Sequence, residues 1–239
     1  MLLLGRPELR ATAEDAYTAA RADADKAPPR EKAVIEAVSI YLGGRLGPAA
    51  DRLDAALAAH PGDGLLMKLA HALRFVLGDI HGMRLSIEAA LPGIGVGNPA
   101  HGYALGCHAF ALEETGAYVQ AEFTGREAVR VAPDDAWGLH AVAHVMDMTA
   151  RSGDGVAWIA GQAGQWDHCN NFGYHIWWHL ALMHLDRGET DEVLRLYDEK
   201  IRADHTDDYR DISNAASLLA RLEMEDVAVG DRWEELAAL

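Results

Sequence analysis

One histidine pattern occurs twice in this chain and limits how it can fold. His140-Ala-Val-Ala-His144 is followed by His175-Ile-Trp-Trp-His179, with the two pairs 35 residues apart. A spacing of i,i+4 on a helix places both imidazoles on one face, with their Cβ atoms about 5–6 Å apart. Gly153 and Gly188 follow the two pairs and are also 35 residues apart. The pairs are therefore predicted to occupy equivalent places in successive copies of one repeat, with a period typical of helix-turn-helix solenoids.

Glycines extend this period along the chain. The predicted helix breaks at residues 44, 78, 116, 153 and 188 are separated by 34, 38, 37 and 35 residues. Between them, helical stripes and Pro/Gly/Asp turns predict five hairpins of helices. Their bounds are 30–42 and 48–59, 64–77 and 80–91, 100–115 and 118–131, 136–150 and 155–165, and 174–186 and 190–202, followed by a first helix at 211–222 and a short segment at 230–239. We therefore predict an all-α, right-handed helix-turn-helix repeat solenoid of five to six units, in which residues 1–29 form an N-terminal helical lead-in and residues 30–239 the array.

The composition excludes several classes of function. The 239 residues carry a formal charge of −16, which repels phosphate backbones and argues against a nucleic-acid partner. No apolar run approaches the 18 residues of a membrane span, so no membrane association is expected. The two cysteines, Cys107 and Cys169, have no metal-ribbon spacing, and so few thiols suggest a reducing compartment. We predict a cytoplasmic protein.

Several strings in the chain are similar to those of a known family. The repeated pattern contains a glycine, then an apolar residue and alanine, and a closing Pro-x-Asp turn. At this period, the pattern resembles the tetratricopeptide repeat in a degenerate form. The strings Ala109–Gly116, Asp135–Met148, Trp177–Leu185 and Ala215–Glu223 together resemble the tetratricopeptide repeat protein 38 family. The resemblance covers about residues 30–239 and implies a fold more than an activity.

The same resemblance implies which side chains face the concave groove. In the tetratricopeptide repeat, positions 13 and 9 residues before the inter-helix glycine commonly do so. Counted from Gly116, Gly153 and Gly188, these positions are Tyr103 and Cys107, His140 and His144, and His175 and His179. First helices of neighbouring repeats pack about 8–10 Å apart. We therefore expect one groove patch of these six residues, with Trp178 as an aromatic neighbour.

Three interpretations of the four histidines stay open from the sequence. They could bind a transition metal such as zinc, since paired histidines on a helix present two nitrogen ligands to one ion. They could instead form a metal-free ligand or acid–base site, oriented by Glu113, Glu114 or Asp147. In the third interpretation they only fill the inner wall of the groove. No glutamate follows the first histidine as in zinc peptidases, and a buried, inert thiol is the preferred interpretation of Cys107.

Two functions follow from these interpretations. The first is a helical-repeat protein whose concave groove binds a peptide, a partner protein or a small ligand. A groove for acidic peptide tails needs Lys or Arg where this chain has His and Cys, which argues against that mode of binding. The alternative is an enzyme or metal-dependent site on the histidine-rich groove.

Overall fold

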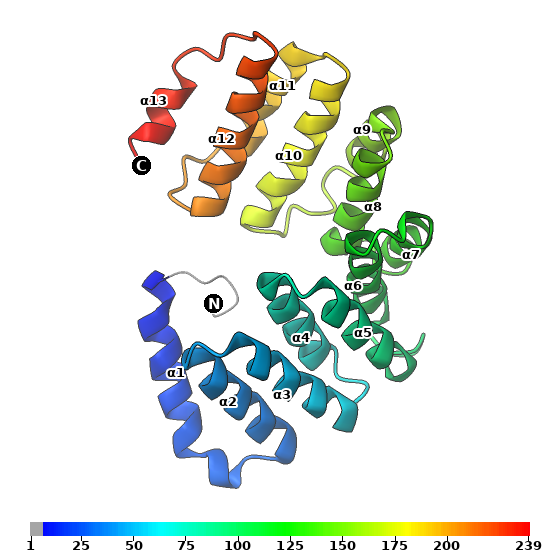
Figure 1. The fold of residues 1–239 in the computed structure, drawn as a ribbon, viewed down its shortest axis with the longest axis vertical. Coiled ribbons are helices and arrows are strands. Elements are labelled where there is room, and N and C mark those ends of the chain that lie inside the picture. Colours follow the sequence, from blue (N-terminus) through cyan, green and yellow to red (C-terminus); the bar gives the residue numbers. More distant parts are fainter. Residues whose placement is uncertain (1–6) are drawn as a thin grey trace. The chain divides into compact units, whose positions relative to one another are not determined.

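Helices make up all the regular structure that the chain adopts between residues 7 and 239, the range that the computed structural model describes. No strand occurs in that range (Figure 1). The predicted all-α class is confirmed. Residues 1–6 of the predicted lead-in lie outside the described residues.

The first compact unit of the chain ends at Ala132. Consecutive helices in it pack as hairpins, α2 on α3, α4 on α5 and α6 on α7. Its helices are α1 (Arg10–Ala22), α2 (Pro29–Leu42), α3 (Leu46–Ala59), α4 (Gly64–Leu77), α5 (Ile80–Ala90), α6 (His101–Glu114) and α7 (Tyr118–Val131), with short 3-10 turns at Pro7–Leu9, Ala24–Lys26 and Leu91–Gly93. The helices predicted at 64–77 and 118–131 have these bounds in the structure.

The second compact unit runs from Pro133 to Leu239. Helix α10 lies at its centre and packs on α8, α9, α11 and α12 (Figure 1). The helices are α8 (Ala136–Met148), α9 (Ser152–Ala160), α10 (Asn171–Asp186), α11 (Thr190–Leu196), which continues as a π-helix at Tyr197–Ile201, α12 (Tyr209–Met224) and α13 (Arg232–Ala237). That residues 30–239 act as one array stays a prediction.

Close packing between α9 and α10 depends on a glycine. A Cβ atom built on Gly155 would lie 2.2 Å from the sulfur of Met183 on α10. Met183 itself is fully buried. A larger side chain at position 155 would have to displace the buried end of the Met183 side chain.

One predicted break is wrong, and the error bears on the histidine pairs. Gly44, Gly78, Gly116 and Gly188 do adopt positive φ, as a helix-ending turn requires. In the fourth repeat, however, the chain reverses at Ala150 (φ 55°), and Gly153 lies in the first turn of α9. His140 therefore lies ten residues before its reversal and His175 thirteen before Gly188, so the two pairs are not at equivalent places.

The N-termini of α8 and α11 differ in how they are capped. Asp135 caps α8, since its carboxylate accepts a hydrogen bond from the Gly138 backbone N–H at 3.1 Å. The N-cap of α11 is Glu189, which makes no side-chain hydrogen bond there, and Thr190 and Asp191 lie inside the helix. The Asp135 cap fixes the start of the helix that carries the first histidine pair.

Within the described residues, no helix is both long enough and apolar enough to cross a membrane.

Candidate metal centre

The four histidines of the two pairs converge on one point. His140 and His144 project from α8, and His175 and His179 project from α10, the neighbouring helix of the same unit. The Nε2 atom of His179 lies 3.0 Å from that of His140, 3.1 Å from that of His144 and 3.1 Å from that of His175. The Nε2 atoms of His140 and His175 are 3.0 Å apart. The predicted convergence of the two pairs is therefore found within the second unit, despite their different places relative to the helix ends.

Hydrogen bonds alone cannot account for this arrangement. The Nε2 atoms of His140, His175 and His179 form a triangle with sides of 3.0, 3.0 and 3.1 Å. In a neutral ring, Nε2 carries either a proton or a lone pair, and a hydrogen bond needs one of each. Of three such atoms at least two are alike, so at least one side of the triangle brings two protons or two lone pairs together. A cation between the three lone pairs satisfies all of them at once.

The spacing of the nitrogens fits a small transition-metal ion. Zinc binds histidine nitrogen at about 2.0–2.1 Å with tetrahedral geometry, which requires nitrogens about 3.3 Å apart. The observed separations of 3.0–3.1 Å reach this value with shifts of a few tenths of an ångström. Each of the four rings offers one nitrogen, and the four candidate ligand atoms all lie within 4.8 Å of one another. The cluster could therefore hold one metal ion.

The protonation of the rings also suits a metal. His175 Nδ1 lies 3.3 Å from Oδ1 of Asn214 on α12. Because a carbonyl oxygen only accepts, Nδ1 carries the proton and the Nε2 lone pair is left for the cluster. Burial lowers the pKa of His175 to about 4, against a smaller raising effect of Asn214. Burial, with the charges of His144 and His175 next, lowers the pKa of His179 well below its usual value. Both rings are therefore neutral near pH 7, the form that binds metals.

Aromatic rings surround the cluster and limit how it can move. Trp178 stacks on His175 with ring centroids 5.3 Å apart and an angle of 16°. Phe172 contacts both His140 and His175, with centroids 5.1 and 5.9 Å away. Trp137 lies 5.6 Å from the His140 ring. His140 and His179 are buried, while His144 and His175 are half-buried, so the cluster is shielded on one side and reachable on the other.

The other predicted site residues lie outside the cluster of four histidines. Tyr103, Cys107, Glu113 and Glu114 belong to the first unit, and a patch that they share with the histidines stays a prediction. Cys107 is buried and accepts a hydrogen bond from Lys68 Nζ at 3.5 Å, consistent with a thiol held in the core. Asp147 is half-buried on α8, one turn beyond His144.

Sequence reasoning missed Asn214, although a signal for it exists. Asn214 comes 35 residues after His179, as His179 comes 35 residues after His144. This count finds Asn214 but does not mark equivalent places in the repeat, because the two histidine pairs lie at different distances from their helix ends. Asn214 reaches the cluster because α12 packs on α10. Phe172 was missed because α10 begins at Asn171, three residues before its predicted start.

Comparison with known proteins identifies the fold. No protein-family model matches the chain. Among solved structures, the chain is similar to TTC0263, described as a thermophilic TPR (tetratricopeptide-repeat) protein of Thermus thermophilus, with a TM-score of 0.60 and 19% identity over 80% of this chain and 99% of that one. The chain has a tetratricopeptide-repeat fold. The chain is also similar to PilF of Pseudomonas aeruginosa, with a TM-score of 0.56 and 13% identity over 87% of this chain and 96% of that one. A third similar structure is the MamA RS-1 ArsTM double mutant, with a TM-score of 0.53 and 14% identity over 82% of this chain and 98% of that one.

Proposed function

We propose that this tetratricopeptide-repeat chain binds one transition-metal ion through His140, His144, His175 and His179. The observation that carries the proposal is the triangle of Nε2 atoms 3.0–3.1 Å apart, which a cation satisfies and hydrogen bonds between neutral rings do not. Imidazole nitrogen suits Zn²⁺, Cu²⁺ and Ni²⁺, and zinc is the probe of choice because it prefers four tetrahedral ligands.

Four protein ligands favour a stabilising role over a catalytic one. Catalytic zinc sites keep one position open for water or substrate, whereas structural sites use four protein ligands. Here two ligands come from α8 and two from α10, so a bound ion would join the first helices of two successive repeats. Enzyme activity on this cluster stays an alternative: it requires one histidine, such as the half-buried His144, to leave the ion.

The test is metal binding by the purified chain. We expect one equivalent of Zn²⁺ after dialysis by elemental analysis, and visible absorption typical of tetrahedral Co²⁺ when cobalt replaces zinc. His179→Gln should abolish both signals, because this nitrogen contacts all three others. The matched control is His205→Gln, since that side chain is 67% exposed and lies outside the cluster.

The controls decide what each result means. Circular dichroism must show that the His179→Gln variant stays helical, and His140→Gln serves as a second variant if it does not. If the wild-type chain binds no zinc, or if the His179→Gln and His205→Gln variants bind it equally, the proposal is wrong.

We also propose a protein-binding role, a cytoplasmic location and kinship with the tetratricopeptide repeat protein 38 family. The fold supports the first, because helical-repeat arrays present long surfaces to peptides and partner proteins. The low cysteine content supports the second. The four sequence strings around the predicted groove support the third.

A further inference from the structure

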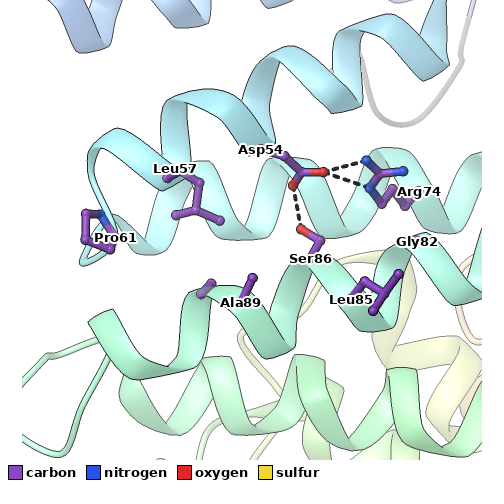
Figure 2. A pocket seen from close by; sticks show the side chains of 10 residues that line it. Asp54, Leu57, Pro61, Arg74, Gly82, Leu85, Ser86 and Ala89 are labelled. Atoms are coloured by element: carbon purple, nitrogen blue, oxygen red, sulfur yellow. Dashed lines mark hydrogen bonds and ion pairs between the residues drawn. The ribbon is translucent and has the colours of Figure 1, made fainter.

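A groove lies between α3 and α5 of the first unit, and no histidine lines it. Its volume is about 630 Å³. Leu57 and Pro61 line one wall, Leu85 and Ala89 line the other, and Asp54 and Arg74 lie at one end (Figure 2). Both walls are second helices of repeats, so this surface differs from the first-helix groove in which the sequence predicted a ligand. The groove is apolar along its length and charged at one end.

The charged end is held in place by a network centred on Arg74. Asp54 accepts hydrogen bonds from Ser86 and from the guanidinium of Arg74, both at 2.5 Å (Figure 2). Arg74 also contacts Asp51 at 2.9 Å and Asp79 at 2.6 Å. Three carboxylates thus share one guanidinium, which leaves two net negative charges. Asp51 lies outside the lining of the groove but contacts Arg74, which lines it, and the Asp51 side chain is 71% exposed. Its carboxylate is therefore accessible to a ligand that extends past the charged end.

The apolar part of the groove has an exposed side chain at its edge. Leu85 is 68% exposed on α5, whereas Leu57 on the opposite wall is buried. A leucine this exposed adds nothing to the core of the unit. Contact with a partner would remove its apolar surface from water, which favours binding.

We propose that this groove binds a basic amphipathic helix of a partner protein. The negative end selects lysine or arginine over acidic side chains, and it excludes phosphate-bearing ligands by the same charge. Gly82, at the charged end, and Ala89, at the apolar end, lie seven residues apart on α5, or about 10.5 Å at 1.5 Å per residue. A helix with a basic residue at one position and apolar residues three, four and seven positions later spans the same distance.

Two labelled peptides of about four helical turns test the proposal. Both carry leucines at the stated spacing, and they differ only in having lysine or glutamate at the charged position and on the solvent face. Fluorescence anisotropy at physiological salt should show binding of the basic peptide and none of the acidic one. Leu85→Ser and Asp51→Lys should each weaken binding about five- to tenfold, as expected for one apolar contact or one reversed charge.

Net charge alone must be excluded, because a chain of charge −16 attracts basic peptides anywhere on its surface. Asp15→Lys is the matched control: it makes the same charge change at an exposed position on α1, outside the groove. The proposal predicts unchanged affinity in Asp15→Lys. Equal weakening by Asp15→Lys and Asp51→Lys, unchanged binding in Leu85→Ser, or no binding of the basic peptide to the wild-type chain would each overturn it.

Discussion

Metal removal should lower the melting temperature of the wild-type chain and leave the His179→Gln variant unaffected. An ion that binds only the folded state adds about 2.7 kcal/mol at a free concentration a hundred times its Kd. In a cooperative body of 150–250 residues, each kcal/mol corresponds to about 2–4 °C, so the expected shift is about 5–11 °C. Four of the six nitrogen separations need to change only from 3.0–3.1 Å to about 3.3 Å, and all the candidate ligand atoms already lie within 4.8 Å of one another.

Differential scanning calorimetry with a chelator and then with added Zn²⁺ measures this shift directly. The His205→Gln control should shift as the wild-type chain does. The reasoning is refuted if the wild-type chain binds one equivalent of zinc without any rise in melting temperature, or if the His179→Gln variant shows the same rise. The first result would mean that the ion binds folded and unfolded chains equally, and the second that it binds elsewhere.

Three further predictions concern single residues. Asn214→Leu should weaken zinc affinity about 10–100-fold by competition titration, since it removes the acceptor that orients a ligand ring, while Asn214→Asp should retain the affinity. Burial, followed by the charge of Lys68, lowers the pKa of His71 from 6.5 to about 3. The neutral ring therefore makes its full contribution to the free energy of unfolding above pH 6.5. Below that pH the free energy of unfolding falls by about 1.4 kcal/mol per pH unit, down to about pH 3. Urea midpoints measured against pH should show a shallower acid slope in His71→Gln. Gly155→Ala should lower the free energy of unfolding, measured in urea, by about 1–3 kcal/mol, because the added methyl group collides with the Met183 side chain. Gly153→Ala is the control and should be tolerated, because its methyl group meets only the end of the Arg187 side chain.

The fold was accessible from the sequence because local signals agree with each other. Glycines that end helices by adopting positive φ, as at Gly78 and Gly116, lie between stripes of apolar residues with helical spacing. The reversal at Ala150 was not accessible, because alanine rarely adopts positive φ and a glycine three residues later offered the usual signal. The turn closes with the same local backbone hydrogen bond as the glycine turns, here from Arg151 N–H to the Met146 carbonyl.

The four histidines that meet could be predicted from the sequence, but the course of the chain around them could not. Spacing of i,i+4 put each histidine pair on one face of its helix, and the repeat placed the helices next to each other. The segment before α10 departed from prediction. Helix α9 ends at Ala160 instead of continuing to Gln165, and the chain turns back so that Trp166 is buried against Trp177, with ring centroids 5.2 Å apart. Such an aromatic contact between a loop and the following helix leaves no periodic signal in the sequence.

The all-nitrogen character of the histidine cluster has a consequence for redox stress. Thiolate ligands oxidise to sulfenic acid or disulfide and then release their metal, whereas imidazole rings do not follow this chemistry. Neither Cys107 nor Cys169 belongs to the set of four ligands. An ion bound there would therefore be retained under peroxide concentrations that empty cysteine-based zinc sites.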